Sequence, residues 1–143
     1  MDRARQWGLA WVFLALTIGL HVTDEALTDF LPLYNSLVES VRASYSWIPL
    51  PTFGFSLWLG GLILGVLLLL GLAPLVFAGN VYLRPVSYFL SVLMIANALG
   101  HIGASIYCQK LAPGVLSSPV LFVAAVALLV ATHRGRRETT DKR

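Results

Sequence analysis

Three ionisable side chains stand close together in the segment HVTDE, at the end of the first long apolar stretch of the chain. They are His21, Asp24 and Glu25, which stand at positions i, i+3 and i+4. Residues at these spacings share one face of an α-helix. An imidazole and two carboxylates on one helix face can bind a metal ion or transfer protons. The segment is therefore a candidate for a chemical site.

A second polar pair, Asn97 and His101, lies inside another apolar stretch far along the chain. The two residues are four positions apart and therefore also share a helix face. Ionisable groups within a membrane are costly, and they face protein rather than lipid. We therefore predict that this pair meets His21, Asp24 and Glu25 in one inward-facing polar cluster.

The predicted cluster has the composition of a metal site in a helical bundle. Such sites take histidines and carboxylates from facing helices, and this ligand set suits zinc, iron or manganese. We predict that His21, Glu25 and His101 are the ligands and that Asp24 and Glu25 are the catalytic carboxylates. Asp24 would either orient a ligand histidine or act as a base on metal-bound water. The residues predicted to contact a substrate or to support the ligands are Asn97, Thr17, Thr28 and Trp58.

The elements that carry these residues are predicted to be membrane helices. Of the 143 residues, 57% are hydrophobic, and the mean hydropathy is +0.77, so the chain has too little polar surface to cover a soluble globule. A bilayer is crossed by about 20 apolar residues. The intervals of this kind are approximately 7–27, 52–77, 85–107 and 113–133.

A short amphipathic helix is predicted between the first two spans. There Leu33, Leu37 and Val41 recur at helical spacing. Pro113 and Gly114 are expected to start the fourth span. The predicted fold is therefore all-α: a single membrane domain formed by a four-helix bundle and one short surface helix.

Basic residues predict the orientation, because positively charged segments stay on the cytoplasmic side. With the N-terminus inside, only Arg42 and Lys110 fall outside, and the basic tail 134–143 is cytoplasmic together with the N-terminus. A cleaved signal peptide is the alternative for the first span, but no small-x-small cleavage site follows it. Because the basic residues lie at helix ends and not along one face, they do not indicate nucleic-acid binding.

The two histidines are predicted to lie at matching depth. His21 is 16 residues past Arg5 and His101 is 17 past Arg84, which corresponds to about 24 and 25 Å along a helix. Both therefore fall in the outer half of the bilayer. A site at this depth favours membrane lipids or other amphiphiles as substrates.

The chain resembles the HXXEE family of small bacterial integral membrane proteins. The signature is written here as HVTDE, and the resemblance continues through NALGHIGASIY and KLAPGVLSSPVLF. Asp24 departs from the signature, where the family has Glu. The resemblance implies a shared site and a bacterial cytoplasmic membrane location, but it names no reaction.

Three functions are compatible with the cluster. The first is a metal-dependent, hydrolase-like enzyme that acts on a lipid or another amphiphile. The second is non-enzymatic binding of a small ligand or proton-linked transport, although four short spans without a repeat offer little material for alternating access. The third is a structural clasp in which the polar residues only hydrogen-bond one helix to another. The sequence leaves the oligomeric state open.

Overall fold

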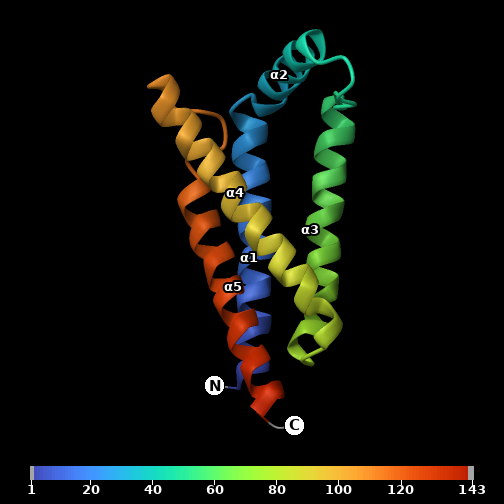
Figure 1. The fold of residues 1–143 in the computed structure, drawn as a ribbon, viewed down its shortest axis with the longest axis vertical. Helices are drawn as coiled ribbons and strands as arrows, with labels where there is room; N and C mark the ends of the chain where they lie inside the picture. The colour runs from blue at the N-terminus through green and yellow to red at the C-terminus, as the bar shows by residue number, and fades with distance from the viewer. Residues whose placement is uncertain (1, 142–143) are drawn as a thin grey trace.

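The computed structural model describes residues 2–141, with side chains through residue 134, as helices joined by turns (Figure 1). The elements are α1 (Arg3–Leu27), α2 (Phe30–Ser44), α3 (Phe55–Phe77), the 3-10 helix η1 (Val81–Leu83), α4 (Arg84–Cys108) and α5 (Ser118–Asp141). No strand occurs in this described part, which confirms the all-α prediction. Three segments are long and apolar enough to cross a membrane, namely α1, α3 and the continuous unit of η1 and α4.

The fourth predicted span, 113–133, is wrong at its start. Residues 113–117 form a turn, and α5 begins only at Ser118. Gly114 has a φ of +77°, in the left-handed region that residues with a Cβ rarely adopt. The apolar part of α5, Ser118–Arg134, is shorter than the other candidate spans. The four-helix membrane bundle therefore stays a prediction.

Helix α1 lies at the centre of the fold. It packs against α3 on one side and α5 on the other, while α4 packs against α5 and crosses α1 obliquely (Figure 1). The close approach of α1 to α3 depends on Gly8, because a Cβ at this position would collide with the ring of Phe77. Buried apolar residues from the four long helices form the core, and they include Trp7, Trp11, Leu14, Val76, Ala98, Leu121 and Leu128.

Helix α2 forms within the interval where the sequence predicts a short helix, and it bends over the end of α1 (Figure 1). Only two residues separate α1 from α2, and the second of them, Asp29, has a φ of +59°. The buried residues of α2 are Leu31 and Val38, whereas Leu33 and Leu37 are exposed. The apolar face predicted through Leu33 and Leu37 is therefore not the one that packs against the rest of the chain.

Candidate metal centre

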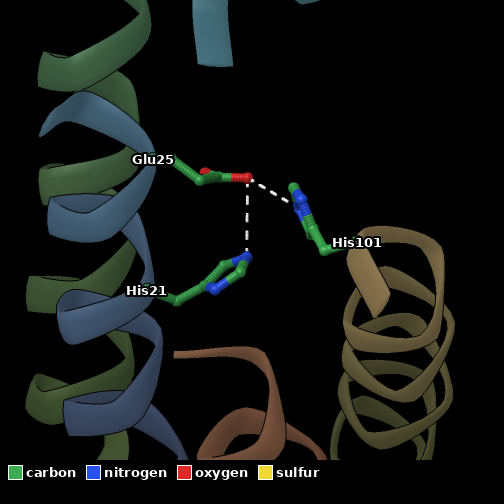
Figure 2. A group of neighbouring side chains, drawn as sticks. All are labelled: His21, Glu25 and His101. Carbon is green, nitrogen blue, oxygen red and sulfur yellow. Dashed lines mark ion pairs between the residues drawn. The ribbon is translucent and has the colours of Figure 1, made fainter. Parts of the chain in front are cut away.

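The side chains of His21, Glu25 and His101 converge between α1 and α4 (Figure 2). Oε1 of Glu25 lies 3.1 Å from Nε2 of His101 and 3.5 Å from Nε2 of His21. The two imidazole rings meet edge to face, with centroids 4.9 Å apart. All three residues are buried, with at most 9% of their surface exposed. The side chains predicted as ligands thus lie together around one carboxylate oxygen.

Two of the three separations between the ligand atoms suit a metal ion. Zinc holds nitrogen and oxygen ligands at about 2.0–2.2 Å, so neighbouring ligands of a tetrahedral site lie roughly 3.3 Å apart. The two separations from Glu25 to the histidines, 3.1 and 3.5 Å, bracket this value. One ligand atom from each of the three residues can be chosen so that all lie within 4.8 Å of one another. Three protein ligands with one position left open are typical of catalytic zinc sites.

Two helices position the ligands in different ways. His21 and Glu25 stand one turn apart on α1, so helix periodicity alone places them on one face. His101 comes from α4, and the turn before it carries Asn97, whose Oδ1 lies 3.0 Å from Nε2 of His21. Asn97 is therefore at the site, as the sequence predicts. The crossing of α4 over α1 brings the two pairs together.

Asp24 is linked to the centre through Ser117, which is not among the predicted site residues. Oδ2 of Asp24 accepts hydrogen bonds from the backbone N–H of Ser117, at 2.9 Å, and from its hydroxyl, at 2.8 Å. Oγ of Ser117 also lies 2.8 Å from Nδ1 of His21. Both of these hydrogen bonds to the Asp24 carboxylate come from Ser117. The carboxylate therefore contacts His21 only through the Ser117 hydroxyl.

The link through Ser117 supports a proton on Nδ1 of His21. A serine hydroxyl has one proton, so when it donates to Asp24 it can only accept from His21. Nε2 of His21 faces two oxygens, Oε1 of Glu25 and Oδ1 of Asn97. Either a proton on Nε2 or a metal ion would lie between Nε2 and these oxygens. A hydrogen bond from the other ring nitrogen is the usual support of a metal-binding histidine.

The turn at residues 113–117 brings Ser117 to this position. A Cβ on Gly114 would lie 3.0 Å from both Cγ of Glu25 and Cε1 of His101, so the backbone passes directly beside the ligands. The backbone N–H of Gly114 donates to Oγ1 of Thr28 at 3.1 Å, and Thr28 in turn donates to the carbonyl of Asp24. Thr28 therefore supports the turn and not the ligands themselves.

Two other predicted residues lie further from the ligands. Thr17 is buried and donates to the carbonyl of Phe13 on its own helix at 2.8 Å. Trp58 packs against Phe30, with ring centroids 6.2 Å apart, and Phe30 packs against His101 at 5.4 Å. The ring of Phe30 thus lies between Trp58 and His101. Phe30 covers the site, and no periodic or polar signal in the sequence indicates this role.

Comparisons of the chain with protein-family models, with curated proteins and with solved structures find no match. The resemblance to the HXXEE family accordingly stays a prediction. A function for this protein has to be inferred from the chemistry of His21, Glu25 and His101 and from the groups that surround them.

Proposed function

We propose that this protein is a membrane enzyme that uses His21, Glu25 and His101 to bind a divalent transition metal ion, either zinc, iron or manganese. The observation that carries the proposal is the convergence of two Nε2 atoms on Oε1 of Glu25, at 3.1 and 3.5 Å. A buried group of this kind is costly in a segment apolar enough to cross a membrane. A bound cation would offset that cost by neutralising the carboxylate and coordinating both imidazoles.

Hydrolysis of a lipid or another amphiphile is the reaction that such a centre supports best. A divalent metal ion polarises a carbonyl group and activates water at neutral pH. In the hydrolysis of an ester, water adds to the acyl carbon and the bond to the alcohol oxygen breaks. Glu25 would hold the ion through Oε1, and we propose that its other carboxylate oxygen would transfer the proton from the attacking water to the departing alcohol. Asp24 orients His21 through Ser117.

The membrane setting supports an amphiphilic substrate. His21 and His101 lie near the ends of their helices that are remote from Arg5 and Arg84, and the predicted orientation places these ends in the outer half of a bacterial cytoplasmic membrane. The resemblance of HVTDE to the HXXEE signature supports a site shared with that family.

A metal-free clasp is the second candidate, because the same separations suit hydrogen bonds. Glu25 would then join α1 to α4 by accepting from both histidines, and its role would be structural. Ligand binding without turnover would also be compatible with this arrangement. Metal content distinguishes the enzyme from the clasp.

Elemental analysis by plasma mass spectrometry tests the proposal directly. The samples are detergent-purified wild type, His21→Ala, His101→Ala and His133→Ala, the last of which changes an exposed histidine at the other end of the molecule. We expect close to one metal ion per chain in wild type and in His133→Ala, and loss of metal from the other two.

A metal-free wild type, even after incubation with zinc, iron or manganese, would leave the clasp or ligand binding without turnover as the function of the cluster. In that case Glu25→Gln should lower the melting temperature, whereas Glu39→Gln, at an exposed position on α2, should not. If Glu25→Gln left both metal content and every phenotype unchanged, the metal proposal would be wrong.

A further inference from the structure

A groove between α2 and α4 leads to the candidate metal centre. Its volume is about 270 Å³. Leu33 and Leu37 line it on the side of α2, and Gly100 and Ala104 line it on the side of α4. Asn97 and His101 are its polar side chains. The groove thus joins an apolar surface to two side chains of the site.

Both walls of the groove have features that packing within the chain does not explain. Leu33 and Leu37 remain 44% and 58% exposed although Leu31 and Val38 bury the opposite side of α2. Facing them, Gly100 leaves the groove wide, since a Cβ at this position would meet nothing within 4 Å. An apolar ligand lying between these walls would cover both leucines.

The shape and charge of the groove select a class of ligand. Pockets for small molecules usually span about 300–1,000 Å³, so a groove of about 270 Å³ accommodates one alkyl chain better than two. Within the described part of the chain, neither Lys nor Arg lines the groove, so apart from a metal ion at His101 a head group would meet the amide of Asn97 and the imidazole of His101. A head group with a carbonyl or carboxylate oxygen fits Asn97 and His101.

A second, smaller cavity reaches Glu25 from the other side of Phe30. Its volume is about 80 Å³, and its lining includes the acidic residues Glu25 and Asp29 together with Trp58. A cavity of this size with polar groups can hold water. The ring of Phe30 lines both spaces and packs against His101 and Trp58. Phe30 therefore separates an apolar approach to the site from a polar one.

We propose that the groove between α2 and α4 binds the alkyl chain of a single-chain amphiphile with an ester or carboxylate head group, and that the head group lies at His101 and Asn97. Water reaches Glu25 through the smaller cavity. This inference rests on the proposed function, because it names the substrate class of the same site. It also assigns Leu33, Leu37 and Gly100 to recognition of the chain.

Gly100 and Gly103 provide a matched pair of variants. Both glycines face open space, but only Gly100 lines the groove. Gly100→Leu should therefore fill the groove without colliding with the protein, and Gly103→Leu should leave the groove open. Leu37→Trp narrows the groove from α2 and provides an independent variant in case Gly100→Leu does not fold. Retained metal content identifies the variants whose site is intact.

The probe is palmitic acid that carries a photoreactive diazirine in its chain, added to the purified protein in detergent. Crosslinked peptides are then identified by mass spectrometry. In wild type we expect labelling of α2 around Leu33 and Leu37 and of α4 near Ala104. Gly100→Leu and Leu37→Trp should lower this labelling at least tenfold, whereas Gly103→Leu should not change it. Unlabelled palmitic acid should compete better than phosphatidylethanolamine, which has two chains.

Three results would overturn the inference in a metal-loaded protein. One is equal labelling of Gly100→Leu and Gly103→Leu, another is labelling confined to the exposed surface of α3, and the third is equal competition by the lipid with two chains. If the wild type is metal-free but its groove is labelled as expected, the groove binds the amphiphile and the metal-dependent function fails. The metal and labelling measurements thus separate the two proposals.

Discussion

The two halves of α1 bury polar groups in different ways. In the N-terminal half, Nε1 of Trp7 donates to Oγ of Ser87 at 3.0 Å, and Nε1 of Trp11 donates to the carbonyl of Leu69 at 2.7 Å. Each indole has one donor and one acceptor to meet it. In the C-terminal half, a single oxygen of Glu25 lies near two imidazoles.

The N-terminal half of α1 thus has a structural arrangement of polar groups, and the C-terminal half has one that is a candidate for chemistry. Paired donors and acceptors are satisfied by the fold, and nothing further is gained by adding a ligand. Two imidazole nitrogens and a carboxylate that share one small space can all be satisfied by a cation. We therefore expect changes in the N-terminal half of α1 to affect stability and changes in the C-terminal half to affect metal binding.

The largest expected effect is on stability. Trp11→Ala removes a side chain that is 1% exposed and should lower the free energy of unfolding by about 3–5 kcal/mol, because a large cavity forms. Denaturation in mixed detergent micelles measures this change. Metal per folded chain should stay at the wild-type level, and its loss in protein that remains folded would contradict the separation of the two halves.

The next effect is on metal affinity. His101→Ala removes one of three ligands and should weaken zinc binding more than 100-fold, beyond the 10–100-fold that loss of a supporting residue typically costs. Titration of metal-stripped protein against a zinc chelator measures the affinity. His133→Ala should bind zinc like wild type. A similar loss in both variants would show that the measured zinc is held elsewhere.

A smaller loss of affinity is expected at Ser117. Ser117→Ala removes the hydroxyl between Asp24 and His21 and should weaken zinc binding about 10–100-fold, since Nδ1 of His21 loses its partner. Ser118→Ala is the control, because both hydroxyls are buried and lie within hydrogen-bond distance of the carbonyl of Gly114, whereas the Ser117 hydroxyl also contacts Asp24 and His21. The same zinc titration compares the two. An equal effect of both variants would indicate a general disturbance of the turn.

The smallest effect is expected from Ser87→Ala in the N-terminal half. Loss of the acceptor for the Trp7 indole should lower the free energy of unfolding by about 1–3 kcal/mol, the usual penalty for an unpaired buried donor. Zinc affinity should remain within twofold of wild type. If Ser87→Ala changed the free energy of zinc binding more than the free energy of unfolding, the distinction between the two halves of α1 would be wrong.

Apolar stretches and residue spacing predict the long helices and part of the candidate site from the sequence. Long apolar intervals predict the positions of α1, α3 and α4, because crossing a bilayer requires a helix of that length. The spacing of His21 and Glu25 places them on one helix face for the same geometric reason. The costly burial of His101 then predicts that it lies near them. These predictions depend only on the residue spacing within each helix and on the membrane that surrounds the helices.

The tertiary structure alone decides the contacts between distant segments. Ser117 lies 96 residues from His21 in sequence and meets it only because the turn before α5, with Gly114 at a positive φ, passes beside α1. Phe30 packs against His101 because the chain changes direction at Asp29, directly after α1. Such contacts depend on turn conformation and on how helices cross, which no periodicity within a single helix encodes.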